Sequence, residues 1–196
     1  MPVEIADRWF ETRRIDDDIT LLWEPHVIPL MRCNIWHVRG RDRDLMIDTG
    51  MGIASLRAAA RHLLDKDVTA VATHTHTDHV GGHHEFERTL VHALEAAELR
   101  SPRDRGTLLA SVLGAEELAK LAKAGYPIEG DLVTALPDAD YDLSNYRLQD
   151  APVTDIVTEI SSASREQTSG IGQVNDSIGA MDAMTSRDSA AETDSP

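Results

Sequence analysis

The chain has 196 residues, enough for one domain with a hydrophobic core, and its 34 acidic and 19 basic residues give a formal net charge of −15 at pH 7. This excess of negative charge argues against binding to the phosphates of a nucleic acid. Because the chain is charged from its start, and no run of about 18 apolar residues follows, the sequence also predicts a cytoplasmic protein that does not enter a membrane.

Strand-like and helix-like patterns alternate in the first part of the chain, which predicts an α/β fold. Three segments with the apolar patterns of β-strands come first: DITLLWEP (18–25), CNIWHV (33–38) and DLMIDTG (44–50). The next segment is expected to be a helix, with an apolar face formed by Ile53, Leu56, Ala60, Leu63 and Leu64. A short strand, VTAVAT (68–73), should follow this helix.

Three further elements are predicted before residue 150. HHEFER (83–88) and EELAKLAKAG (116–125) have helix-like patterns, and TLVHAL (89–94) has that of a strand. Gly125, with a proline two residues later, is a typical helix end. Cys33 is expected to be a buried, inert thiol, because the sequence has no second cysteine with which it could form a disulfide.

The composition changes near residue 150, where Ser, Thr, Asp and Ala become frequent. We expect a domain over residues 1–150, a coiled-coil-like helical segment over 151–184 and a disordered tail over 185–196. The long C-terminal helix is predicted from a heptad pattern in which seven of nine positions are apolar: Val153, Val157, Ile160, Ser164, Gln167, Ile171, Val174, Ile178 and Met181. Glycines within the segment weaken such a helix, so it would need a partner, or it would dock on its own domain.

A cluster of potential metal ligands lies directly after the strand predicted over 68–73. The segment THTHTDHVGG (73–82) contains four such side chains at close spacing: His74, His76, Asp78 and His79. A strand that ends in a tight loop can direct imidazoles and a carboxylate to one point, and zinc accepts nitrogen and oxygen ligands at about 2.0 to 2.2 Å. The two glycines that follow permit a close turn of the backbone. The spacing therefore predicts a metal site.

Two motifs in this region resemble those of a known enzyme superfamily. HTHTDH (74–79) resembles the His-x-His-x-Asp-His signature of the metallo-β-lactamase-fold hydrolases, and LMIDTGMG (45–52) resembles the Asp-Thr-Gly turn that precedes this signature. The resemblance covers roughly residues 15–150. It implies the N-terminal half of an αββα sandwich, with up to two zinc ions at one edge.

The resemblance also implies roles for individual residues. His74 and His76 would hold the first metal, and Asp78 and His79 the second. Asp48 would orient the ligand loop through hydrogen bonds, although an aspartate ahead of a glycine can also serve only to form a turn. A water shared by two cations loses a proton near neutral pH, and the hydroxide can attack an acyl, thioester, lactam or phosphoryl centre of a small-molecule substrate. Asp78 would be catalytic, because it can orient that water or carry its proton.

Ligands that the superfamily takes from the later half of its fold do not occur in this sequence. No histidine lies beyond His92, and His83 and His84 follow the cluster too closely to replace them, so we expect these three in the core or at its rim. Three aspartates could bridge two metals by residue type alone: Asp138, Asp140 and Asp150. We therefore expect weak or incomplete zinc binding, impaired activity, and self-association of a chain whose inner sheet face lacks its usual partner.

A second resemblance lies in the C-terminal part. VTDIVTEISSASREQTSGIGQVNDSIGAMDAMT (153–185) resembles part of the cytoplasmic helical hairpin of methyl-accepting chemotaxis proteins. This resemblance implies a coiled coil, with Glu159 or Glu166 as modification sites. The chain would then join two gene fragments, naturally or through a frameshift. The alternative function is accordingly a catalytically silent fusion that acts as a coiled-coil interaction module.

Overall fold

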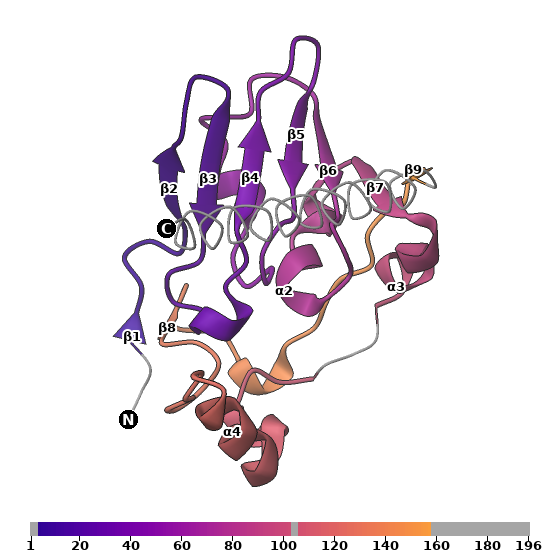
Figure 1. Ribbon diagram of the computed structural model, residues 1–196. Coiled ribbons are helices and arrows are strands. Elements are labelled where there is room, and N and C mark those ends of the chain that lie inside the picture. The colour runs from indigo at the N-terminus through magenta and orange to yellow at the C-terminus, as the bar shows by residue number, and fades with distance from the viewer. Residues whose placement is uncertain (1–3, 103–105, 158–196) are drawn as a thin grey trace, which may run out of the picture. The chain divides into compact units, whose positions relative to one another are not determined.

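A mixed seven-stranded sheet forms the centre of the computed structural model, which describes residues 4–102 and 106–157. Its strands lie in the order β2-β3-β4-β5-β6-β7-β9 (Figure 1). Their bounds are Glu11–Arg14 (β2), Ile19–Trp23 (β3), Ile35–Val38 (β4), Asp44–Ile47 (β5), Val68–Val71 (β6), Arg88–His92 (β7) and Asp155–Val157 (β9). Two short strands, β1 (Glu4–Ile5) and β8 (Ala135–Leu136), pair in parallel outside this sheet.

The pairing of the strands changes from antiparallel to parallel at β5. Strands β2 to β5 are antiparallel neighbours, whereas β5, β6, β7 and β9 run parallel to one another. Parallel strands end at the same edge of a sheet, so the segments after β5 and β6 meet there. Ile47 pairs with Val71 near the two strand ends, and helix α2 (Thr77–Val80) lies at the same edge (Figure 1).

The helices of the described residues are short. They comprise α1 (Leu56–Ala59), α2, α3 (Ala96–Arg100) and α4 (Gly114–Lys123), with 3-10 turns η1 (Pro29–Met31), η2 (His83–Glu85), η3 (Ala93–Glu95), η4 (Ala110–Leu113) and η5 (Leu143–Asn145). The helix predicted around Leu56 is confirmed only over α1, but its apolar face is buried as expected, since Leu56 and Ala60 are fully buried. The predicted helix before Gly125 is confirmed as α4, and Gly125 has a φ of 94°.

The helix predicted over HHEFER is wrong. Only the single turn η2 forms, after which Phe86 takes an extended conformation and β7 begins at Arg88. Phe86 is 2% exposed and packs in the main core, while Thr89 and Val91 alternate with more exposed neighbours along β7. Core packing and strand pairing therefore outweigh the local helix propensity of this segment.

The main core lies against one face of the sheet. It contains buried side chains from β3, β4, β5 and β6 together with those of α1, and a second, smaller cluster lies around β7 and α3. Cys33 is 6% exposed, so the prediction of a buried cysteine is confirmed. Burial also raises the pKa of its thiol, which disfavours the reactive thiolate. This mixed α/β, sheet-rich arrangement agrees with the predicted half-sandwich.

The predicted C-terminal helix does not begin at residue 153. Residues 155–157 form strand β9, which pairs in parallel with β7, and Val153 packs against the smaller core cluster. Without β9, the main-chain groups on the outer side of β7 would be unpaired. The β-branched residues of the segment also suit a strand. The compact unit accordingly runs through residue 157. The remainder of the predicted helix (158–184) and the predicted tail (185–196) lie outside the described residues.

Candidate metal centre

Two loops at the carboxyl edge of the parallel strands form the candidate site. One follows β5 and begins at Asp48, and the other follows β6 and contains the predicted ligands. Main-chain hydrogen bonds join the loops: Thr49 N donates to His79 O at 2.7 Å, and Gly81 N donates to Gly50 O at 2.8 Å. The position of the cluster is therefore set by strand pairing, which brings Asp48 beside residues about 30 positions later in the chain.

Close approach of the two backbones requires glycine. A Cβ atom on Gly81 would lie 2.1 Å from the carbonyl carbon of Met51, and one on Gly52, whose φ is 69°, would lie 2.3 Å from Gly81 O. A Cβ on Gly82 would lie 2.9 Å from Thr49 O. The expected role of the Gly81-Gly82 pair in a close turn is confirmed.

Asp48 holds the ligand loop in place. This residue has a φ of 58° and is 3% exposed. Its Oδ1 accepts a hydrogen bond from Thr73 N at 2.8 Å, and its Oδ2 accepts one from His79 Nδ1 at 2.7 Å. Asp48 therefore acts both as a turn residue and as the residue that orients His79. Because Nδ1 of His79 is engaged, its Nε2 is the nitrogen left to bind a metal.

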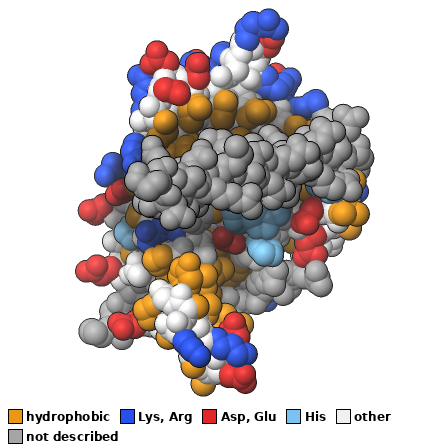
Figure 2. Space-filling view, in the orientation of Figure 1, with side chains coloured by type: hydrophobic (Ala, Val, Ile, Leu, Met, Phe, Trp, Pro, Cys, Tyr) orange, Lys and Arg blue, Asp and Glu red, His pale blue; other side chains and the backbone are white. Residues whose placement is uncertain are grey.

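Three imidazole rings gather at this edge. The ring centroids of His74 and His76 are 4.5 Å apart, and those of His74 and His79 are 4.1 Å apart. His76 is exposed and His74 is half-buried. Burial lowers the pKa of His74, and the neighbouring rings of His79 and His76 lower it further, so this ring is held neutral. A patch of histidine side chains is visible on the face drawn in Figure 2.

The predicted ligands Asp78 and His79 contact each other directly. His79 Nε2 lies 3.3 Å from Asp78 Oδ2. Burial lowers the pKa of His79, but its contacts with Asp48 and Asp78 raise it to a net value of about 9. Burial conversely raises the pKa of Asp78, while its hydrogen bond to His79 and the charge of that ring bring the net pKa below the ordinary value. A metal ion that binds here would have to displace the proton of His79, because only the neutral imidazole is a ligand.

The donors suit zinc by type, but each potential half-site has few of them. Across residues 4–102 and 106–157, no three His, Cys, Asp or Glu side chains are arranged to hold one ion. The pairs His74 with His76 and Asp78 with His79 supply imidazole and carboxylate ligands, which zinc accepts. The described residues therefore offer ligand types that suit zinc, but they do not form a closed four-ligand site.

Comparison with known proteins decides the family. The sequence model of the metallo-beta-lactamase superfamily matches residues 28–147 of this chain. This chain belongs to the metallo-beta-lactamase superfamily. Acyl-coenzyme A thioesterase MBLAC2 from Bos taurus is 38% identical over 106 residues, and that from Homo sapiens is 37% identical over 106 residues. Each match covers 48% of this chain and 38% of the relative, so the chain spans well under half the length of these curated relatives.

Similar solved structures include other members of the superfamily. A metallo-beta-lactamase from Hirschia baltica is 22% identical, with a TM-score of 0.39, and the match covers 46% of each chain. The subclass B3 metallo-beta-lactamase MEM-A1, isolated from a soil metagenome library, is 16% identical, with a TM-score of 0.40, over 55% of this chain and 41% of that one.

Sequence reasoning missed a carboxylate that supports this superfamily's ligand loop. Glu95, in η3, accepts hydrogen bonds from both N and Oγ1 of Thr75, and the distance from N is 2.9 Å. The bond from the Thr75 hydroxyl contributes most to lowering the pKa of Glu95. Thr75 stands between His74 and His76, so Glu95 holds the backbone of the segment that carries both. Glu95 lies 20 residues after Thr75, so no local sequence pattern indicates this contact.

A second missed carboxylate lies behind the Asp-Thr-Gly turn. Glu24 is 1% exposed and accepts hydrogen bonds from Trp9 Nε1 at 2.9 Å and Met51 N at 2.8 Å. Burial raises the pKa of Glu24 to about 7. Tyr146 Oη donates to Met51 O at 2.7 Å, so segments more than 90 residues apart hold the same turn.

The remaining histidines near the cluster have structural contacts, as predicted. His83 is fully buried, and its Nδ1 lies 2.7 Å from Thr49 Oγ1. Burial lowers the pKa of His83 to about 4, so the ring is neutral. His84 Nδ1 lies 2.9 Å from Gly81 O, and His92 Nδ1 accepts a hydrogen bond from Leu94 N at 3.3 Å. A bridging role for the exposed residues Asp138, Asp140 and Asp150 stays a prediction.

Proposed function

We propose that this chain carries the metal-binding half of a zinc-dependent hydrolase that cleaves acyl thioesters of coenzyme A. The observation that carries the proposal is the gathering of three imidazoles and one carboxylate at the strand edge, with Asp48 bonded to His79 Nδ1. The substrate class is taken from the thioesterases to which nearly half of the chain is similar. Self-association and a cytoplasmic location, both predicted from the sequence, belong to the same proposal.

In this proposal His74 and His76 would hold one zinc ion, and Asp78 and His79 a second. When bound, such cations supply an acidified water and polarise a carbonyl group. The chain itself supplies the orientation of the ligands. Asp48 keeps Nε2 of His79 available by engaging Nδ1, as a carboxylate behind a zinc-bound histidine commonly does.

Asp78 also has the properties required of a proton carrier. Its pKa lies below the ordinary value, so the carboxylate is ionised at neutral pH. A bound zinc ion would take the place of the His79 proton and would favour the ionised form in the same way. An ionised carboxylate can accept a hydrogen bond from the attacking water and take up its proton. Glu95, which bonds to Thr75, holds the neighbouring ligand loop while this occurs.

The experiment compares zinc content and thioester hydrolysis of the wild type with those of His76→Ala and His62→Ala. Both histidines are exposed, but His62 follows α1 and lies outside the cluster. His76→Ala should lose zinc and hydrolysis of an acyl-coenzyme A, while His62→Ala should retain both. Identical zinc content and hydrolysis in the wild type and His76→Ala would show that the cluster is inert.

The substrate class is tested separately. The value of kcat/KM should be higher for an acyl-coenzyme A than for a simple ester or a β-lactam measured under the same zinc concentration. A preference for the lactam would leave the hydrolase proposal intact and would contradict the thioester assignment.

A further inference from the structure

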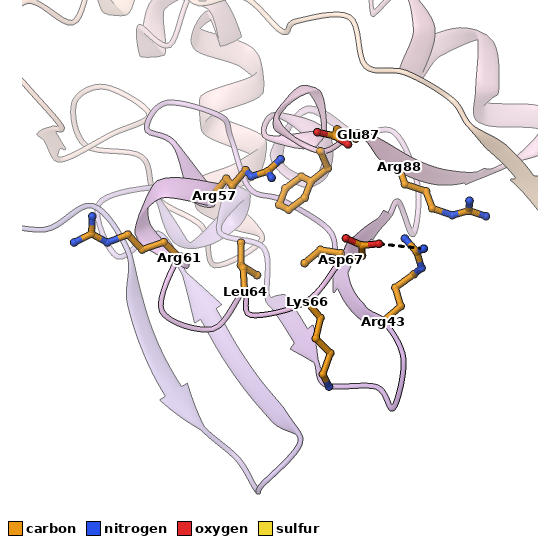
Figure 3. A pocket seen from close by; sticks show the side chains of 10 residues that line it. Arg43, Arg57, Arg61, Leu64, Lys66, Asp67, Glu87 and Arg88 are labelled. Carbon is orange, nitrogen blue, oxygen red and sulfur yellow. Dashed lines mark ion pairs between the residues drawn. The ribbon is translucent and has the colours of Figure 1, made fainter.

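A pocket lies at the edge of the sheet opposite the histidine cluster. It has a volume of about 280 Å³ and is lined by residues at the amino ends of β5, β6 and β7 and by residues of α1 and the turn after it (Figure 3). Its cationic lining residues are Arg43, Arg57, Arg61, Lys66 and Arg88. The cluster follows the carboxyl ends of β5 and β6, so the length of a four-residue strand, roughly 13 Å, separates the two edges. The pocket is therefore a separate site.

The lining is basic in an acidic chain. Five of its ten residues are cationic and two, Asp67 and Glu87, are acidic, which leaves an excess of three positive charges. The chain as a whole carries a formal charge of −15. Concentration of positive charge against this background creates a local field that attracts anions.

The arginines approach the pocket from two sides. Arg57 belongs to α1 and Arg61 to the turn that follows it, whereas Arg43 precedes β5 and Arg88 begins β7. In Figure 3 Arg57 and Arg61 lie on one side, and Arg43 and Arg88 lie together on the other. The side chain of Lys66 points away from the middle, and its Nζ donates to Gly40 O at 2.6 Å.

Existing contacts neutralise Arg43, Arg57 and Arg61 only in part. Arg43 Nη2 lies 3.6 Å from Asp67 Oδ2, and an exposed pair at this distance is weak. Arg57 Nη1 donates to the main-chain oxygen of Glu85 at 2.9 Å, a contact that leaves its charge in place. Arg61 makes no ion pair with a carboxylate in the part of the chain that the structure describes. At least these guanidinium groups can bind an anion.

The geometry points to a binding site for a small organic diphosphate. Guanidinium groups match the oxygens of phosphate in a planar, bidentate manner, and arginines on two sides exceed what a single phosphate group needs. Leu64 and Val68, both half-buried, and the buried Phe86 add an apolar surface that suits the organic part. The volume is near the lower end for ligand pockets, which fits a diphosphate with the organic part partly exposed.

Isothermal titration calorimetry on the full chain after removal of metal tests this site, with pyrophosphate, ADP and adenosine as probes. Removal of metal matters because diphosphates bind metal ions. Pyrophosphate and ADP should bind and adenosine should not. Arg61→Glu and Arg43→Glu should each weaken the binding of ADP by about tenfold or more, because each reverses one charge-assisted contact.

Arg13→Glu is the matched control, since Arg13 is an exposed arginine on β2 that does not line the pocket, and its replacement changes the net charge by the same amount. This variant should bind ADP within about twofold of the wild type, as expected for a charge outside the contact. Equal weakening by Arg13→Glu and Arg61→Glu would overturn the proposal, because the net charge of the whole chain, and not the pocket, would then determine the binding of ADP. Absence of binding by both diphosphates, or equal binding of adenosine and ADP, would also overturn it. Binding unchanged in His76→Ala would separate this site from the metal centre.

Discussion

Asp48 is not one of the predicted metal ligands, but its hydrogen bonds determine how they are placed. Its two carboxylate oxygens join the Asp-Thr-Gly turn to Thr73 and to His79, on either side of the ligand loop. Asparagine keeps the size of this side chain and tolerates a positive φ, but it lacks the negative charge that strengthens the bond to the imidazole.

We therefore predict that Asp48→Asn weakens zinc binding by about 10- to 100-fold while leaving the fold intact, the range observed when such supporting carboxylates are removed. Competition with a chromogenic chelator measures the affinity, and circular dichroism checks the fold. An affinity equal to that of the wild type would mean that the bond between Asp48 and His79 does not help the imidazole to bind metal.

Glu24 should make stability depend on pH. Its folded-state pKa is about 7, above the ordinary value of 4.5, so the folded chain binds the proton more tightly than the unfolded chain does. Stability from this group is present below pH 4.5 and is lost as the pH rises through about 7. The loss amounts to at most about 3 kcal/mol, from 1.36 kcal/mol per unit of pKa.

Glu24→Gln should accordingly show a smaller fall in the free energy of unfolding between pH 5 and pH 7.5 than the wild type does. Urea unfolding at both pH values measures this difference, and the comparison cancels groups that titrate in both proteins. The same fall in both proteins would show that Glu24 titrates normally in the folded chain.

Among the elements, the two site loops depend on backbone contact that side chains would prevent. Gly81 illustrates this, because its added Cβ would meet the main chain of Met51 at 2.1 Å. Gly125 provides a contrast, since it has a φ of 94° and no atom lies within 4 Å of its added Cβ.

Gly81→Ala is predicted to destabilise the fold by about 3 kcal/mol or more, because the two loops must move apart. Gly125→Ala should cost only about 1 to 2 kcal/mol, the strain of alanine at positive φ. Urea unfolding of the two variants ranks these costs. If Gly125→Ala proved the more destabilising, the close contact between the loops would not be a determinant of stability.

Most strands of the sheet can be predicted from the sequence, whereas two segments form other elements than expected. Strands β3 to β7 were all predicted, because alternating or continuous apolar residues report burial in a sheet directly. HHEFER failed as a helix because Phe86 packs into the core and β7 pairs with β6, two effects that involve distant residues. Residues 155–157 failed for the same reason, since β7 recruits them into the sheet.

At the scale of the whole molecule, the sheet has a second apolar face. The cross-strand register places Trp36, Ile47, Val71 and Leu90 in one row, and all four are half-buried. Apolar side chains also reach the surface over the strands in Figure 2. A face of this kind tends to be covered by another layer of structure.

We predict that the full chain self-associates at micromolar concentration, with this face buried, and that Trp36→Asp weakens the association. Sedimentation velocity measures the size, and His62→Ala serves as a control outside the face. A compact wild-type monomer that binds no hydrophobic dye would exclude self-association through this surface. The coiled-coil and chemotaxis-like segment predicted beyond residue 157 stays a prediction, because it lies outside the described residues.

The ligand cluster, its place after a strand and the family were readable from sequence, because HTHTDH and the Asp-Thr-Gly turn are contiguous patterns with a direct chemical meaning. The supporting carboxylates Glu24 and Glu95, and the basic pocket at the far edge, emerged only from the folded chain. Each joins residues that are about 15 to 45 positions apart in sequence, and only the pairing of strands brings such residues together.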